Sequence, residues 1–97
     1  MALSPHAAQY PRRTEHAQAR RVGRDTLIIH LLLKQYHILN NIAGRIWELA
    51  DGSRSTSDIV SVIAGEFDMD DGVVREDVIA TIESLSALRL IEPGAAQ

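Results

Sequence analysis

The fold is decided by the stretch Leu39-Asn40-Asn41-Ile42-Ala43-Gly44-Arg45-Ile46-Trp47-Glu48-Leu49-Ala50-Asp51-Gly52. Its apolar residues recur at helical spacing and form one stripe: Ile42, Ala43, Ile46, Trp47 and Leu49. Asn40 or Asn41 is suited to cap the first turn, because an asparagine side chain accepts a hydrogen bond from a free amide. Gly52 is suited to end the helix, because glycine adopts the left-handed conformation at little cost. The stretch therefore predicts a strand end, a capped amphipathic helix over about residues 41–50, and a stop.

A small antiparallel sheet is predicted before this helix. Residues 18–22, 26–33 and 35–39 read as strands, and Gly23 lies in the first turn. In the middle strand, alternate residues divide into two faces, which are Leu27, Ile29, Leu31 and Leu33 on one side and Ile28, His30, Leu32 and Lys34 on the other. Both faces carry apolar residues, and one bundle covers only one of them. We therefore expect the Ile28/Leu32 face to be covered by a second copy of the chain, as a homodimer, or by a partner enzyme.

Two more helices are predicted after the first, over about residues 57–67 and 74–90. Ser55 or Thr56 is suited to cap the second helix. The third has apolar residues at spacings of three and four: Val74, Val78, Ile82, Leu85 and Leu88. Strands followed by three helices predict an α+β fold, a winged helix-turn-helix with a three-stranded antiparallel sheet packed on a three-helix bundle. Residues 1–16 are expected to form a flexible N-terminal arm, 17–92 the folded domain and 93–97 a C-terminal tail.

Composition narrows the function classes. The 97 residues make one domain, and the absence of cysteine excludes disulfides, thiol catalysis and thiolate metal sites. The net charge of −3 gives no support to nucleic-acid binding. No signal peptide is visible, and the longest apolar stretch, residues 27–33, is too short to span a bilayer. The expected location is the cytoplasm, without membrane contact.

Several motifs together resemble the PqqD family, whose domain is also called the RiPP recognition element. They are Leu39-Asn40, Ile46-Trp47-Glu48-Leu49, Asp51-Gly52, Asp58-Ile59-Val60 and Glu76-Asp77-Val78. Members of this family bind the leader segments of ribosomally made and modified peptides (RiPPs), and the resemblance covers roughly residues 20–92. The strand Tyr36-His37-Ile38-Leu39 is similar to that of stand-alone members in lasso-peptide pathways. Ala50 stands where quinone-pathway members have cysteine, which argues against the quinone pathway itself.

The resemblance implies that a leader peptide adds as a strand along the third strand and lies against the last helix. Carried onto this sequence, the peptide-binding residues are Tyr36, His37, Ile38 and Leu39 on the strand, with Asp77, Thr81 and Ser84 on one helix flank. Leu39 is equally suited to the core. The implied function is a stand-alone, non-catalytic protein without a cofactor. It would present the peptide to a separate modifying enzyme or leader peptidase.

Two other functions suit parts of this sequence. A winged-helix transcription regulator needs basic residues on its recognition helix, whereas residues 66–92 hold eight acidic residues against Arg75 and Arg89. An enzyme subunit that stabilises its partner without binding a leader is a further alternative.

The acidic link 68–72 does not fit a calcium loop, because glycine is missing at the sixth position. These aspartates are therefore expected to cap a helix and to form a turn. His30 and His37 lack a convincing third metal ligand. The basic residues Arg12, Arg13, Arg20, Arg21 and Arg24 suit a solvated tail or an acidic partner.

Overall fold

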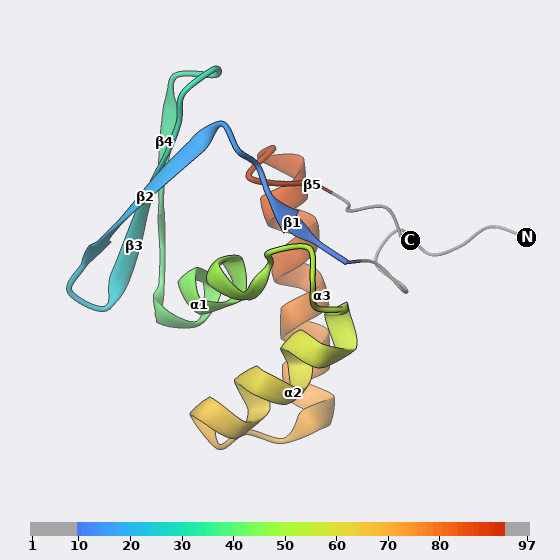
Figure 1. Cartoon of the computed structure of the whole chain (residues 1–97). Coiled ribbons are helices and arrows are strands. Elements are labelled where there is room, and N and C mark those ends of the chain that lie inside the picture. The colour runs from blue at the N-terminus through green and yellow to red at the C-terminus, as the bar shows by residue number, and fades with distance from the viewer. Residues whose placement is uncertain (1–9, 93–97) are drawn as a thin grey trace, which may run out of the picture.

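The structure, a computed structural model, describes residues 10–92. Within them the elements are β1 (Arg12–Arg13), β2 (Ala17–Val22), β3 (Asp25–His30), β4 (Gln35–Leu39), α1 (Asn41–Leu49), α2 (Thr56–Phe67), α3 (Asp71–Ala87) and β5 (Ile91–Glu92). Strands β2, β3 and β4 form an antiparallel sheet in that order, and β1 pairs with β5 in a second, two-stranded sheet. Helix α1 contacts β3 and β4 as well as α2 and α3, and therefore joins the sheet to the other helices (Figure 1). The predicted α+β fold, a three-stranded antiparallel sheet with three helices, is confirmed.

The buried residues of β3 show which face of the sheet packs against the helices. Thr26, Ile28 and His30 are buried against the helices, and Ile28 is fully buried at 0% exposure. The expectation that the Ile28/Leu32 face would stay uncovered by the bundle is therefore wrong. It fails because β3 ends at His30, and Leu32 lies in the following turn rather than in the strand. Two hydrogen bonds close that turn, from the Lys34 amide to the His30 carbonyl (2.8 Å) and from the Leu33 amide to His30 Nδ1 (3.1 Å).

Side-chain caps set where the helices begin. Asn40 caps α1 by accepting from the Ala43 amide at 2.8 Å, and Ser55 forms a reciprocal capping box with Asp58 at the start of α2. Asp70 accepts from two amides at the start of α3, which therefore begins three residues before the predicted Val74. Gly52 does have a positive φ of 87°, but it lies in the turn after α1, whose C-cap is Ala50.

The N-terminal segment 10–16 is packed against the rest of the domain. The sequence analysis predicted a flexible arm there, and for these residues that prediction is wrong. Pro11 and Thr14 are buried, and Arg13 pairs with Ile91 in the β1–β5 ladder. Backbone bonds also run from the Arg13 amide to the Ala50 carbonyl (2.7 Å) and from the Gly52 amide to the Pro11 carbonyl (3.0 Å). The folded unit thus extends before residue 17. The rest of the predicted arm, residues 1–9, and the predicted tail, 93–97, lie outside the described residues.

Candidate peptide-binding site

Strand β4 is an edge of its sheet. It pairs with β3 on one side, and within residues 10–92 no strand pairs with its other side. The backbone amides and carbonyls on that side are therefore open to an additional strand. Of the four predicted contact residues, Tyr36 is 73% and Ile38 69% exposed, whereas Leu39 is 8% exposed and belongs to the core.

His37 takes an intermediate position. Its register partner is Ile28, so its side chain lies on the inner face of the sheet. The ring is partly buried, and among the described residues its Nε2 atom is buried without a hydrogen-bond partner. Leaving a buried polar atom unpaired costs about 1–3 kcal/mol. The inner side of β4 therefore carries one unsatisfied polar group beside the open edge.

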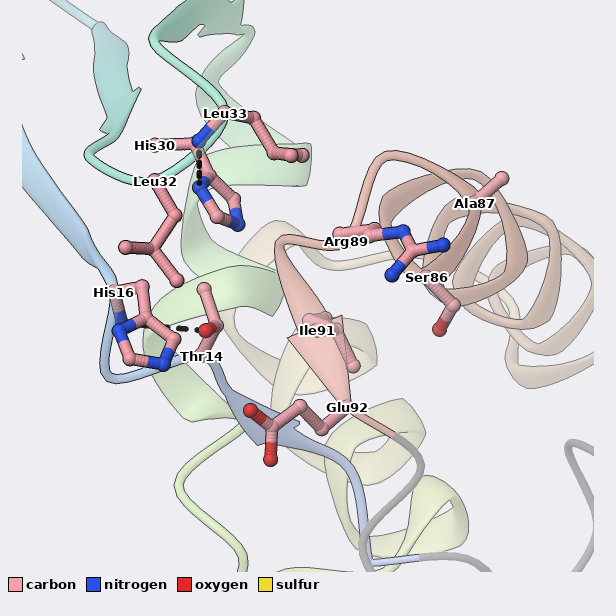
Figure 2. A pocket seen from close by; sticks show the side chains of 10 residues that line it. All are labelled: Thr14, His16, His30, Leu32, Leu33, Ser86, Ala87, Arg89, Ile91 and Glu92. Atoms are coloured by element: carbon pink, nitrogen blue, oxygen red, sulfur yellow. Dashed lines mark hydrogen bonds between the residues drawn. The ribbon is translucent and has the colours of Figure 1, made fainter.

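A pocket of about 590 Å³ lies where the β3–β4 turn faces the end of α3 (Figure 2). The turn contributes Leu32 and Leu33, and the end of α3 and the turn after it contribute Ser86, Ala87 and Arg89. The remaining lining residues come from the N-terminal segment, β3 and β5: Thr14, His16, His30, Ile91 and Glu92. Leucine side chains on one side and polar side chains on the other give this pocket a mixed character. It lies beside the turn that leads into β4, and the strand itself contributes no lining residue.

The predicted flank of α3 is not the flank that reaches this pocket. Asp77 and Ser84 are exposed and Thr81 is half-buried, and none of the three lines a described pocket. Helical residues turn by about 100° each, so Ser84 and Ser86 lie on opposite sides of the buried stripe. That stripe consists of Val74, Val78, Ile82 and Leu85. Ser84 and Ser86 are the same residue type on either side of the stripe, so residue type alone gave no signal for choosing between them.

A solvent-exposed ion pair with two hydrogen bonds joins α1 to α2. Arg45 donates to both carboxylate oxygens of Glu66, from Nε at 2.8 Å and from Nη2 at 2.7 Å. These bonds lower the pKa of Glu66 and raise that of Arg45. No group of three or more histidine, cysteine, aspartate or glutamate residues within the described part of the chain is placed to hold a metal ion. The site around β4 therefore offers backbone edges, apolar side chains and a pocket, which are the features of a peptide-binding surface.

Comparisons with known proteins identify the family and the fold of the chain. The sequence profile described as "Coenzyme PQQ synthesis protein D (PqqD)" matches residues 9–91. The fold is similar to TbiB1 in complex with the TbiA(beta) leader peptide, with a TM-score of 0.77 and 23% identity over 87% of this chain and 98% of that one. A lasso peptide synthetase B1 complexed with its leader peptide gives a TM-score of 0.75 and 17% identity, over 87% of this chain and 99% of that one.

A third similar structure is the PqqD truncation of PqqCD from Methylobacterium extorquens, described as a functional and stand-alone RiPP recognition element. It gives a TM-score of 0.71 and 19% identity, over 93% of this chain and 99% of that one. No curated protein shows a significant sequence match. At these identities the solved structures establish a shared fold. No helix among residues 10–92 has the length and apolar character needed to cross a membrane.

Proposed function

This chain belongs to the PqqD family, and from that membership we propose that it binds the leader segment of a ribosomally synthesised precursor peptide. The observation that carries the proposal is the open edge of β4, with Tyr36 and Ile38 exposed beside it. An extended peptide that pairs with this edge gains main-chain hydrogen bonds, and its alternate side chains select for sequence. The protein itself performs no bond chemistry. It raises the effective concentration of the peptide for a separate modifying enzyme or leader peptidase.

The binding surface is proposed to have two walls. The first is β4, where Tyr36, Ile38 and the half-buried His37 accompany the main-chain pairing, and Leu39 holds the strand in the core. The unpaired Nε2 of His37 supports this wall, because a polar group of a bound peptide would relieve its cost.

The second wall is α3. The family resemblance implies that the leader contacts the flank that carries Asp77, Thr81 and Ser84. The pocket at the β3–β4 turn instead favours contact with the flank that carries Ser86. Both flanks are accessible to solvent, so substitutions on each can be compared directly.

Two similar structures support the proposal. TbiB1 and the lasso peptide synthetase B1 are each complexed with a leader peptide, and both share the fold of this chain. A lasso-peptide-like pathway, acting in the cytoplasm, is the setting we propose for the present chain.

The rival function is a winged-helix transcription regulator, since strands beside three helices also suit that description. The acidic residues of α3, among them Asp71, Glu76 and Asp77, disfavour it, because they repel phosphate.

Titration with the leader segment of the precursor peptide encoded beside this protein tests the proposal. We expect a micromolar or tighter complex, which corresponds to about −8 kcal/mol or better. Hydrogen exchange should show new protection at residues 36–39, and a scrambled leader of the same composition should give none. Specific retention of DNA at physiological salt, without leader binding, would instead support the transcription regulator.

A further inference from the structure

The C-terminal end of α3 carries an arginine at a position where helices usually carry glycine. Leu88 is the C-cap, and the next residue, Arg89, has a positive φ of 64°. The Arg89 amide donates to the Ser86 carbonyl at 3.0 Å. The Leu90 amide donates to the Leu85 carbonyl at 2.9 Å. This pair of bonds is the Schellman motif, whose left-handed position favours glycine, because any side chain there crowds the backbone. The turn alone therefore gives no reason for an arginine.

The side chain of Arg89 lines the pocket of about 590 Å³ that faces the β3–β4 turn (Figure 2). Within residues 10–92, its guanidinium forms no ion pair. Among the described residues that line the pocket, the one carboxylate belongs to Glu92, which pairs with Arg12 at 3.3 Å. The pocket therefore contains a cation whose charge no carboxylate of the described chain offsets.

A buried histidine supplies a second hydrogen-bond donor to the same pocket. His30 is 4% exposed, and its Nδ1 accepts a hydrogen bond from the Leu33 amide at 3.1 Å. Because Nδ1 accepts, the proton of the neutral ring is on Nε2. Figure 2 shows Nε2 pointing away from the turn, and it has no partner among the residues that the structure describes. The turn thus holds a fixed N–H group in the pocket wall.

This lining suits a carboxylate on an aliphatic stem. A guanidinium binds a carboxylate through two parallel hydrogen bonds, and the N–H of His30 and the hydroxyl of Ser86 are further donors. An apolar side chain in the same place would remove water from Arg89 and His30 without replacing its hydrogen bonds, which is unfavourable. The stem of the ligand would contact the aliphatic part of the wall: Leu32, Leu33 and Ile91.

We propose that this pocket binds a glutamate or aspartate side chain of the leader peptide and that Arg89 selects it. The inference rests on the proposed function and adds the chemical class of one leader residue to it. The turn that lines the pocket leads directly into β4, so one end of a peptide paired with β4 passes beside the pocket. Main-chain pairing accepts many sequences, whereas a paired carboxylate distinguishes one leader from another. The unfavourable backbone conformation of Arg89 is then explained by the contact that its side chain makes.

Replacing Arg89 by glycine separates this role from a structural one. In the full chain, Arg89→Gly should keep or raise the midpoint of urea unfolding, because glycine is relaxed at the left-handed position. It should weaken binding of the leader of the precursor peptide encoded beside this protein by about tenfold or more. If Arg89 acts only by placing a positive charge at the C-terminal end of α3, the variant should instead lower the midpoint and leave the dissociation constant unchanged.

A matched pair of variants controls for general electrostatic attraction. Arg89→Gln and Arg75→Gln each remove one positive charge from an exposed arginine, but Arg75 lies on α3 and lines no described pocket. Arg89→Gln should weaken leader binding by about tenfold, and Arg75→Gln should change it by less than about twofold.

A leader series identifies the residue that the pocket binds. Each glutamate and aspartate of the leader is changed singly to glutamine or asparagine, and each peptide is titrated into the unaltered protein and into Arg89→Gln. At one leader position the two losses should not add, because either change alone removes the same contact. At every other position the losses should add.

Each result decides the inference. Weaker leader binding in Arg89→Gly without loss of stability, together with one non-additive leader position, supports it. Unchanged leader binding in both Arg89 variants overturns it and leaves the proposed function standing. Additive losses at every acidic leader position, or a leader that binds without any acidic residue, also overturn it. Failure of the unaltered protein to bind the leader is a different result, which contradicts the proposed function and this inference with it.

Discussion

The indole Nε1 of Trp47 donates a hydrogen bond of 3.0 Å to the carbonyl oxygen of Leu90, and so ties α1 to the segment that follows α3. That carbonyl also accepts from the Thr14 amide at 3.1 Å. The guanidinium of Arg13 lies 5.4 Å from the centroid of the Trp47 ring and donates to the carbonyls of Trp47 and Glu48. One side chain thus joins three segments that are distant in sequence, and the N-terminal strand is held by this junction.

Trp47→Ala should therefore destabilise the fold by about 3–5 kcal/mol, as buried large-to-small changes do. Trp47→Phe keeps most of the packing and loses the hydrogen bond, at a cost of about 1–2 kcal/mol. The loss stays at that level because the Leu90 carbonyl keeps its bond from Thr14. Urea unfolding followed by circular dichroism measures both, since Trp47 is the only tryptophan and its fluorescence is lost. A loss below about 1 kcal/mol for Trp47→Ala would contradict its burial.

Gly44 is expected to be needed for the approach of α1 to β3. A Cβ atom at this position would lie 2.5 Å from Oγ1 and 3.1 Å from Cβ of Thr26. Alanine gains up to about 1 kcal/mol in helix propensity. Overpacking of a buried contact costs about 1–3 kcal/mol. The clash therefore outweighs the gain, and Gly44→Ala should lower the free energy of unfolding.

Two companion variants sharpen that test. Gly65→Ala on α2 is the control, because nothing lies within 4 Å of its added Cβ, and it should raise stability by up to about 1 kcal/mol. Thr26→Ala combined with Gly44→Ala should recover part of the loss, because the clashing hydroxyl is removed. Equal stability changes at Gly44 and Gly65 would mean that α1 does not pack closely on β3.

The Arg45–Glu66 pair predicts an acid dependence of stability. Hydrogen bonds from Arg45 hold the pKa of Glu66 below its usual value of 4.5. A carboxyl with a lowered folded-state pKa stabilises the fold above its unfolded-state pKa, and this contribution is lost as the pH falls through the folded-state pKa. Both side chains are more than a third exposed, so Glu66→Gln should cost only about 0.5–1 kcal/mol at pH 7. The cost should disappear at the acid end of a pH series of urea unfolding curves.

The helices were predictable because their signals are local. Asn40 and Ser55 each mark a helix start through side-chain hydrogen bonds to nearby amides, and the sequence contains these caps next to apolar periodicity. The start of α3 at the Asp70 cap was predicted three residues late, because the apolar periodicity begins only at Val74. Strand β4 matched its predicted residues 35–39 for a similar reason, since Tyr36, Ile38 and Leu39 favour a strand and lead directly into the Asn40 cap.

The regions that were predicted wrongly owe their structure to contacts that periodicity along the sequence does not reveal. Residues 31–33 continue an apolar run, and only the bonds to the His30 carbonyl and its ring show that the strand has ended. The packing of residues 10–16 depends on Ala50, Leu90 and Ile91, which follow much later in the chain. The flank of α3 nearest the pocket likewise depends on where the β3–β4 turn lies in space. Single-sequence periodicity contains none of these relationships.

The two flanks of α3 are distinguished by placing one substitution on each. Ser86 lines the pocket at the β3–β4 turn, and Ser84 lies on the other side of the buried stripe. We expect Ser86→Lys to weaken leader binding by about tenfold or more, because the long side chain fills the pocket at the β3–β4 turn. Ser84→Lys should change it by less than about twofold. The reverse order, together with a loss in Asp77→Ala, would assign the leader to the flank of Asp77, Thr81 and Ser84. Titration calorimetry with the leader measures all three variants.

The mechanism of strand addition is tested by proline at two adjacent positions of β4. In a strand, consecutive amides point to opposite sides, so of His37 and Ile38 one donates toward β3 and the other toward the open edge. Proline at the outward amide removes a donor that only the leader would use. That variant should stay folded and lose leader binding, whereas proline at the inward amide should break the β3–β4 ladder and lower stability. Tyr36→Ala should weaken binding by only about 1–2 kcal/mol, since it removes a side-chain contact and leaves the ladder intact. Urea unfolding and leader titration of the two proline variants therefore give opposite patterns. If both variants stay folded and bind leader normally, the peptide does not pair with β4.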